Sequence, residues 1–380
     1  MPKVALIKCE SYDYDEVKKS VANGIALLGG AQKFVRQGEK ILLKPNILVG
    51  DAPKKCVTTN PAVFEAVAEL FIKEGVKLSY GDSPAIGNPL KAAKKTGLAE
   101  KAEKLGIPMA DFKTGVDIFF EKGIQNKKFT IAKAIFDNDG VISLPKLKTH
   151  GLEKLTGAVK NQFGCIPGVL KGEFHVKLPD ATDFAKMLVD LNNFVNPRLY
   201  IMDGIYGMEG NGPRGGTPKK MNILLFSDDP IALDATVCRL VDVKPEYVPT
   251  IKHGMEAGIG TYLETEIELV GDDFTVFSTK NFEVNKKPLK PYKPGSITSF
   301  INKAIVQKPF IISDKCVQCG ICVNMCPATP KALFFENEDK SIAPIYNYDD
   351  CIRCFCCQEI CPESAIKLKT PFLRKIVNLF

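Results

Sequence analysis

The sequence has little histidine and no long apolar run. Histidine occurs only at His150, His175 and His253, which are too dispersed to form a metal-binding motif. No apolar stretch approaches the length needed to span a bilayer, and residues 1–8 read as a strand rather than a secretory signal. We therefore predict a soluble, cytoplasmic protein without a membrane span.

Nucleotide-binding loops are also missing. Glycines crowd the stretch from Gly204 to Gly216, too densely for regular structure, but no Gly-Lys-Ser/Thr follows and no G-x-G-x-x-G stands at the first strand-to-helix turn. No basic stripe is interleaved with aromatic residues, so we expect no nucleic-acid partner. Flavin or nicotinamide binding stays open, because many such sites have no short signature.

What the sequence does contain is two copies of one cysteine pattern, 35 residues apart. Each copy reads C-x2-C-x2-C-x3-C-P, the bacterial-type iron–sulfur ligation pattern, in which the fourth cysteine serves the other cluster. We therefore predict two [4Fe-4S] clusters. Their ligands would be Cys316, Cys319, Cys322 and Cys361 for one cluster, and Cys351, Cys354, Cys357 and Cys326 for the other.

Zinc and disulfides are the alternative uses of these thiols. Zinc sites commonly use two separated cysteine pairs, whereas here each copy packs four cysteines together and ends in Cys-Pro. Nothing marks the chain as secreted, which disfavours disulfides. The segment from about 309 to 369 resembles the two-[4Fe-4S] bacterial ferredoxins, with all ligand positions filled. The spacing selects Cys357 as a ligand and leaves Cys356 as an extra thiol.

The chain before this segment alternates short apolar runs with helical patterns. That alternation predicts an α/β domain with a largely parallel sheet over residues 1–280. Predicted strands are 4–8, 40–44, 76–81, 140–144, 198–203, 222–227 and 265–271; predicted helices are 15–28, 61–73, 89–104, 182–193, 230–241 and 246–257. Asn60-Pro61 and Asp229-Pro230 are typical helix openings.

Four of the predicted strands end in polar or turn residues. These ends are Pro45-Asn46, Asp82-Ser83, the segment from Pro145 to His150, and Asp203-Gly204. Ligands of open α/β sheets bind at the carboxyl ends of the strands. If the strands are parallel, we expect all four groups to line one crevice.

These short segments resemble the DUF362 family. The resemblance covers roughly residues 1 to 275 and is carried by Leu43-Lys-Pro-Asn46, Gly81-Asp-Ser-Pro84, Leu144-Pro-Lys-Leu-Lys-Thr-His150, Thr156-Gly-Ala-Val-Lys-Asn161, Glu209-Gly-Asn-Gly-Pro213 and Asp229-Pro-Ile-Ala-Leu-Asp234. The family is often fused to ferredoxin-type repeats. Its activity is poorly defined, so the resemblance implies a fold and a pocket rather than a reaction.

The crevice is expected to be basic. Lysines crowd the segment from Lys146 to Lys160, and the net charge of +7 lies entirely before residue 311, because residues 311–380 carry equal numbers of acidic and basic side chains. Either an anion neutralises these cations or the segment is a solvated basic loop. The predicted cofactor-binding residues are Lys44, Asn46, Asp82, Ser83, Lys146, Lys160 and Asn161. His150 and Lys148 are the predicted catalytic residues, with His150 as the proton-transfer group.

The remaining predictions concern organisation. Residues 281–307 read as a Pro/Lys-rich linker with a short helix, 308–370 as the ferredoxin domain, and 371–380 as an apolar tail that packs back on a domain. Cys165 is expected to be buried rather than reactive.

The leading functional hypothesis is an iron–sulfur electron-transfer protein. It would pass single electrons between two [4Fe-4S] clusters and an anionic substrate or cofactor in the crevice, with a redox partner protein as the second partner. Whether it is an enzyme is left open. The alternatives are a non-catalytic ferredoxin-type carrier or adaptor that docks an acidic partner protein, and a regulatory iron sensor.

Overall fold

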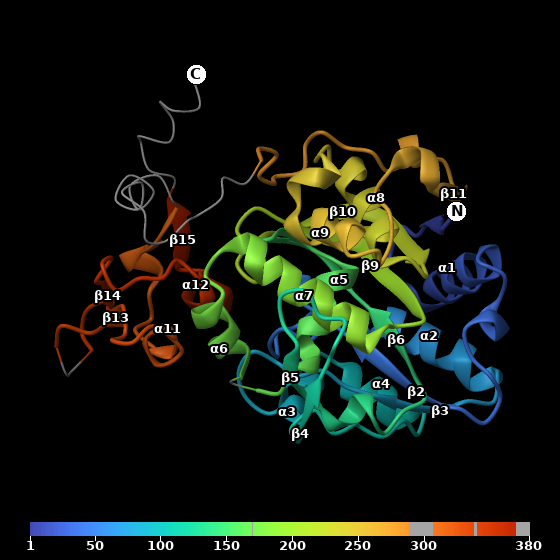
Figure 1. Ribbon diagram of the computed structural model, residues 1–380, viewed down its shortest axis with the longest axis horizontal. Helices are drawn as coiled ribbons and strands as arrows, with labels where there is room; N and C mark the ends of the chain where they lie inside the picture. Colours follow the sequence, from blue (N-terminus) through green and yellow to red (C-terminus); the bar gives the residue numbers. More distant parts are fainter. Residues whose placement is uncertain (169, 289–306, 338–339, 370–380) are drawn as a thin grey trace.

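The computed structural model describes residues 1–168, 170–288, 307–337 and 340–369. Its largest feature is a nine-stranded sheet (Figure 1) with the order β11-β1-β10-β9-β6-β2-β3; β7 also pairs with β9, and β8 pairs with β7. The strands are β1 (Lys3–Lys8), β2 (Lys40–Pro45), β3 (Lys77–Tyr80), β6 (Gly140–Leu144), β7 (Lys146–His150), β8 (Lys154–Thr156), β9 (Leu199–Glu209), β10 (Thr217–Ser227) and β11 (Glu268–Gly271). Strands β3, β2, β6 and β9 are mutually parallel, whereas β10 is antiparallel to both of its neighbours. The predicted α/β class with a largely parallel sheet is confirmed.

Helices cover both faces of this sheet, because alternate residues of each buried strand point to opposite sides. In β2, Ile41 and Leu43 pack under one group of helices and Leu42 packs under the other. The first group is α1 (Tyr14–Leu27), α2 (Pro61–Lys73), α3 (Pro89–Lys95) and α4 (Leu98–Lys104). The second is α5 (Ala158–Asn161), α7 (Ala181–Val195), α8 (Pro230–Leu240) and α9 (Pro249–Glu256), and α7 and α9 lie in front of the sheet in Figure 1.

The predicted helix openings at Asn60 and Asp229 are confirmed. The Asn60 side chain accepts a hydrogen bond of 2.9 Å from the Ala62 N–H. Asp229 accepts bonds of 2.8 Å from two N–H groups at the start of α8, and Pro61 and Pro230 occupy the first helical positions. These caps fix where α2 and α8 begin after their strands.

Two local predictions are wrong. Residues 89–104 form two helices rather than one, because the chain turns at Gly97 with φ +77° between α3 and α4. The predicted glycine loop from Gly204 is partly strand: β9 continues through Gly204 and Gly207 to Glu209. A side chain would be crowded at both glycines, by Ile223 at Gly204 and by Leu147 at Gly207.

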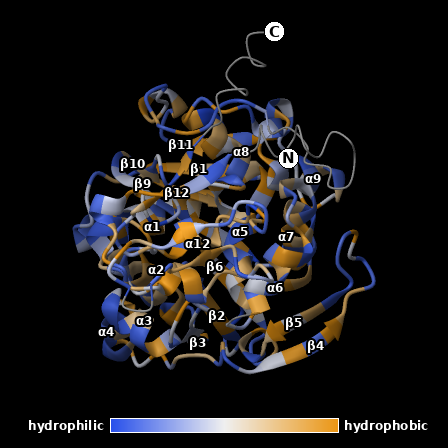
Figure 2. Cartoon of the chain, turned by 90° about the vertical axis from the view of Figure 1, so that its left-hand side faces the viewer, coloured by the Kyte–Doolittle hydropathy of each residue, from blue (hydrophilic) through white to orange (hydrophobic). Residues whose placement is uncertain are grey.

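Several elements of the middle segment were not predicted. They are the hairpin β4 (Gly115–Phe119) with β5 (Lys128–Ala132), the short strands β7 and β8, and the helices α5 and α6 (Leu170–Lys177). The β4–β5 hairpin lies at the margin of the molecule (Figure 2). Strands β7 and β8 are buried along their whole length, so the alternative that this lysine-rich segment is a solvated loop is wrong.

The C-terminal elements form a small body at one end of the molecule (Figure 1). Strand β12 (Lys308–Ile311) pairs with β15 (Ile366–Lys369) and β13 (Leu333–Phe334) with β14 (Ile345–Tyr346), both antiparallel. Two short helices, α11 (Ile321–Asn324) and α12 (Cys356–Ile360), follow the two cysteine turns. The short helix predicted before residue 307 and the predicted tail 371–380 lie outside the described residues, and the domain boundaries stay predictions. Among the residues that are described, none of the helices has both the length and the apolarity to cross a membrane.

Candidate functional site

The first three cysteines of one motif meet the last cysteine of the other. Cys316, Cys319, Cys322 and Cys361 line one small cavity between the two cysteine turns. Four thiols gathered around one space from two interleaved motifs match the donor set of a [4Fe-4S] cluster. The residues therefore fit the cluster that the spacing predicts, and their individual ligand roles stay a prediction.

The other four predicted ligands are three cysteines of the second motif and the last cysteine of the first. Cys354 and Cys357 are buried, whereas Cys351 and Cys326 are half-buried. The Tyr346 hydroxyl lies 3.2 Å from the Cys357 sulfur. Among the described residues, no three His, Cys, Asp or Glu side chains are gathered closely enough to hold a single metal ion. The assignment of Cys326, Cys351, Cys354 and Cys357 to a second cluster rests on the repeat spacing.

Helix α12, which carries part of the second motif, docks on the α/β domain. The Gln358 amide donates to Asn211 O, Asn211 Oδ1 and Gly212 O at 2.9–3.0 Å. Arg214 donates to the carbonyl of Ile360 and is itself held by Asp51 through bonds of 2.7 and 3.0 Å. In Figure 2 α12 lies over the end of the sheet. The glycine-rich turn after β9 therefore provides the hydrogen bonds on which helix α12 docks.

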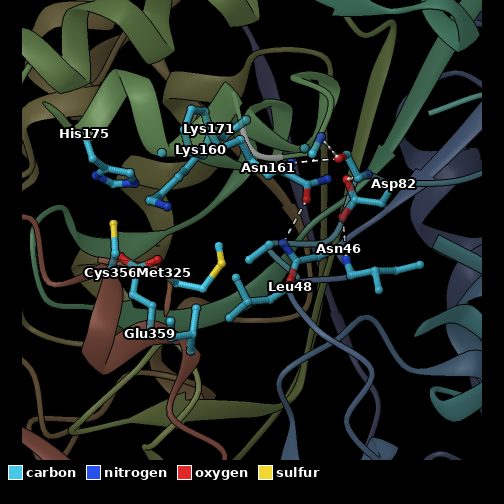
Figure 3. A pocket seen from close by; sticks show the side chains of 18 residues that line it. Asn46, Leu48, Asp82, Lys160, Asn161, Lys171, His175, Met325, Cys356 and Glu359 are labelled. Atoms are coloured by element: carbon cyan, nitrogen blue, oxygen red, sulfur yellow. Dashed lines mark hydrogen bonds between the residues drawn. The ribbon is translucent and has the colours of Figure 1, made fainter. Parts of the chain in front are cut away.

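A pocket of about 100 Å³ lies between this helix and the α/β domain (Figure 3). Its α/β side comes from the segments after β2 and β3, from α5 and from α6; its other side comes from Met325, Cys356, Glu359 and Ile360. Of the predicted cofactor-binding residues, it is lined by Asn46, Asp82, Ser83, Lys160 and Asn161, while Lys44 and Lys146 do not line it.

A buried ion pair joins Asp82, which lines the pocket, to Lys44 behind it. Lys44 Nζ lies 2.8 Å from Asp82 Oδ1, and both side chains are almost completely buried. The second carboxylate oxygen of Asp82 accepts a 2.6 Å hydrogen bond from the Ile47 N–H. Next to it, the Lys171 ammonium donates to the Ser83 hydroxyl at 2.7 Å, and burial lowers the pKa of Lys171 to about 7. Lys44 therefore acts behind Asp82 rather than on a ligand.

An amide network crosses from β2 to α5. The Asn46 amide donates to Asn161 Oδ1 at 3.1 Å, and Asn46 Oδ1 accepts from Lys148 Nζ at 2.7 Å. Lys148 also donates to the Val57 carbonyl at 2.8 Å. Burial, with the charge of Lys160, lowers the pKa of Lys148 to about 7. Lys148 thus stands behind the pocket wall and orients Asn46.

The expectation that all four strand ends line one crevice is wrong for Lys146 and Asp203. Lys146 Nζ lies 2.8 Å from Asp203 Oδ2, and both side chains are fully buried. The Tyr12 hydroxyl donates to Asp203 at 2.9 Å and accepts from Lys146 at 2.8 Å. Asp203 neutralises the charge of Lys146 inside the protein, because the two residues lie opposite each other in the paired strands β7 and β9.

His150 connects the two parts of the molecule. Its Nδ1 accepts hydrogen bonds of 3.1 Å from the Leu152 and Glu153 N–H groups, which places the ring proton on Nε2, 2.8 Å from Glu359 Oε1 on α12. Burial and the nearby Lys160 charge lower the His150 pKa. His150 does not line the pocket. Its predicted role in proton transfer stays a prediction, and its contacts are those of a residue that positions Glu359.

Four residues of the pocket with titratable side chains were not predicted: Lys171, His175, Glu359 and Cys356. Lys171 and His175 lie on α6, a helix that the sequence did not predict because its apolar residues have no clear helical periodicity. Cys356 is visible as an extra thiol, but only the docking of α12 places it in the pocket. Cys165 is fully buried and burial raises its pKa to about 12, as expected for an unreactive thiol.

Fold and site together define an α/β domain joined to a ferredoxin-type module. Residues 41–239 match the model of the domain of unknown function DUF362, and residues 308–362 match that of a 4Fe-4S dicluster domain. The chain belongs to the DUF362 family. Both resemblances seen in the sequence are confirmed.

Similar proteins include a thylakoid-associated protein of Synechocystis sp., 36% identical over 249 residues, which cover 65% of this chain and 77% of that protein. Among solved structures, the lactate racemase apoprotein of Thermoanaerobacterium thermosaccharolyticum aligns with 13% identity and a TM-score of 0.43. A Thermotoga maritima protein aligns with 9% identity and a TM-score of 0.33. The chain spans 56% of each of these two structures, covering 63% and 57% of its own length, and similarity at this level carries no argument about function.

Proposed function

We propose that this protein passes single electrons between two [4Fe-4S] clusters and an anionic substrate or cofactor in the pocket between α12 and the α/β domain. The match to a 4Fe-4S dicluster domain supports an iron–sulfur electron-transfer role. The observation that carries the proposal further is that Cys356, which lies between the predicted ligands Cys354 and Cys357, lines the same pocket as Asn46, Asp82 and Lys160.

The chain's own residues would have three tasks. The eight motif cysteines would hold the clusters, which supply one-electron chemistry when bound. Lys160 and Asn161 would contact the ligand, because their side chains line the pocket. Lys148 and His150 would act indirectly: Lys148 orients Asn46 and His150 orients Glu359. Burial of these groups excludes water, which strengthens their effect on a bound charge.

The test is anaerobic purification followed by iron and sulfide analysis, EPR of the reduced protein and mass spectrometry of any small molecule released on denaturation. We expect about eight iron atoms per chain, a coupled two-cluster signal and a released anionic molecule. Zinc in place of iron would end the electron-transfer proposal. Detection of the protein in the soluble or the membrane fraction of its host cells would test the proposed cytoplasmic location.

A carrier or adaptor role is the second candidate, and one observation favours it. Cys319 is exposed and the adjacent Val317 side chain is 58% exposed, so the first cysteine cavity lies close to the protein surface. A redox partner protein could dock there, and the net charge of +7, which lies before residue 311, suits an acidic partner that also contacts the α/β domain. A tight, salt-sensitive complex formed with an empty pocket would favour this role.

A further inference from the structure

One end of the pocket gathers four chemically distinct side chains. Lys160, His175, Cys356 and Glu359 lie together there, while Asn46, Asn161 and Asp82 lie at the other end (Figure 3). The polar groups at the second end bond mainly to one another or to neighbouring protein groups. A ligand at the first end would therefore meet side chains that are not fully used in hydrogen bonds within the protein.

Lys160 is the available charge at that end. Its ammonium forms no ion pair or hydrogen bond with any residue that the structure describes, and its recorded contact is the Phe163 ring, whose centroid is 5.6 Å away. The other charged groups of the pocket have partners: Asp82 has Lys44, Glu359 has His150, and Lys171 donates to Ser83. Glu359 is the acidic side chain at the same end, and it is engaged by His150 at 2.8 Å. A half-buried ammonium without a direct ion-pair partner favours binding of an anion.

His175 supplies an available polar atom beside it. The side chain is buried, and its Nδ1 has no hydrogen-bond partner among the described residues. The ring is fixed by stacking on Phe184 at 4.4 Å and by an edge contact with Phe163 at 5.8 Å. Burial lowers the His175 pKa to about 4, so at neutral pH the ring is uncharged and has one N–H to donate.

The rest of this region is apolar and small. Leu48, Ala85, Phe163, Met325 and Ile360 contribute to the wall of a pocket of about 100 Å³. One ammonium that has no direct ion-pair partner suits a ligand with one negative charge. Apolar walls suit a short hydrocarbon body and disfavour a strongly hydrated dianion such as phosphate.

We propose that this pocket binds a small monocarboxylate, with its carboxylate between Lys160 and His175 and its body beside Cys356. The proposal rests on the proposed function in one respect, that the ligand of the electron-transfer protein occupies this pocket. It names the class of that ligand.

Cys356 provides the test, because it is the half-exposed thiol outside the ligand pattern, whereas Cys9, Cys56, Cys165 and Cys238 are buried. The anaerobic holoprotein is treated separately with iodoacetate and with its neutral analogue iodoacetamide. In either reaction the Cys356 sulfur displaces iodide, a carbon–sulfur bond forms and the thiol proton passes to water. The ratio of the two rates at Cys356, located by mass spectrometry, cancels the intrinsic reactivity of the thiol.

We expect the iodoacetate to iodoacetamide ratio to fall about tenfold in Lys160→Met, because a charge-assisted contact is lost. His175→Phe should lower it in the same direction, and Lys252→Met, which removes an exposed lysine outside the pocket, should leave it unchanged. Propionate should slow labelling of the wild type, and propionamide should not. An equal ratio in the wild type and Lys160→Met would overturn the proposal.

Calorimetric titration of the holoprotein with propionate, propionamide and inorganic phosphate gives an independent measurement. Tighter binding of propionate than of the other two, weakened about tenfold by Lys160→Met, is expected. Tighter phosphate binding, or no propionate binding, would overturn the carboxylate assignment. Iron content and EPR of the same samples separate the two proposals. Intact cluster signals without a preference for propionate would support electron transfer and overturn the carboxylate assignment. A preference for propionate in a protein without clusters would support the carboxylate assignment and overturn electron transfer.

Discussion

The two cysteine motifs have the same spacing but different surroundings. In the first, Cys319 and Asn324 are exposed and Val317 is 58% exposed. In the second, Cys357, Gln358, Glu359 and Ile360 are all buried where α12 meets the α/β domain. With the 35-residue repeat, Gln358 and Glu359 correspond to Val323 and Asn324 of the first motif. The two motifs therefore share the predicted ligand pattern and differ in the residues between the ligands. These residues are more exposed in the first motif, and in the second they dock on the α/β domain beside the pocket.

The largest difference is expected when a ligand is removed from each motif. Cys322→Ser and Cys357→Ser should each lose about half of the iron, because each removes one predicted ligand. Cys357→Ser should also loosen α12 from the α/β domain, since Cys357 lies within that helix. Iron analysis with limited proteolysis measures both effects. Equal proteolytic resistance in the two variants would contradict the distinction between the motifs.

A smaller effect is expected from the docking side chains. Gln358→Ala removes the donor to Asn211 and Gly212 and leaves their buried oxygens unpaired, which should lower the free energy of unfolding by roughly 1–3 kcal/mol. The control is Asn324→Ala in the first motif, one position after the counterpart of Gln358, because Asn324 is exposed and its loss should change little. Chemical unfolding of the holoproteins measures the difference, and equal losses would argue against docking through Gln358.

A pH-dependent effect is expected at Glu153, next to the strand that docks α12. Its side chain is fully buried, neither carboxyl oxygen has a partner among the described residues, and burial raises its pKa to about 8. Because an unfolded glutamate ionises at a lower pH, the folded protein holds a proton that the unfolded chain has lost, and stability falls as the pH rises from about 4.5 to about 8.

Glu153→Gln removes that ionisation. It should raise the free energy of unfolding by roughly 1–3 kcal/mol at pH 9, with less effect at pH 5. Thermal unfolding at the two pH values measures this, with the exposed Glu100→Gln as control. A gain that is equal at both pH values would mean that Glu153 is not protonated in the folded protein at pH 5.

The smallest effect on iron is expected at Cys356. The repeat spacing assigns ligation to Cys354 and Cys357, so Cys356→Ser should keep the iron content and the EPR signal of the wild type. Loss of iron in this variant, with Cys357→Ser unaffected, would reverse the assignment.

Local sequence signals predicted much of this fold. Strand β2 and helix α2 were expected within one residue of their observed bounds, because a continuous apolar run and a capping Asn-Pro pair are both local. Strand β7 was missed for the opposite reason. Its Lys146 and Lys148 were expected to bind a ligand in the crevice or to lie in a solvated loop. They are buried because Asp203 and Asn46, from distant segments, pair with them.

The same contrast applies to the site. The carboxyl ends of β2 and β3 identified Asn46, Asp82 and Ser83, because parallel strands bring their ends together. No sequence spacing could predict that His175 and Cys356 line the same pocket. They meet through the docking of α12, which depends on contacts such as His150 with Glu359 from opposite parts of the chain.

The most direct test of the coupling between the pocket and the second motif is an EPR-monitored redox titration of the wild type and Lys160→Met. Removing a positive charge near one cluster disfavours electron gain there, so one of the two midpoint potentials should fall while the other stays unchanged. Two unchanged potentials, or two that shift equally, would contradict the proposal that the pocket adjoins one of the two predicted clusters and not the other.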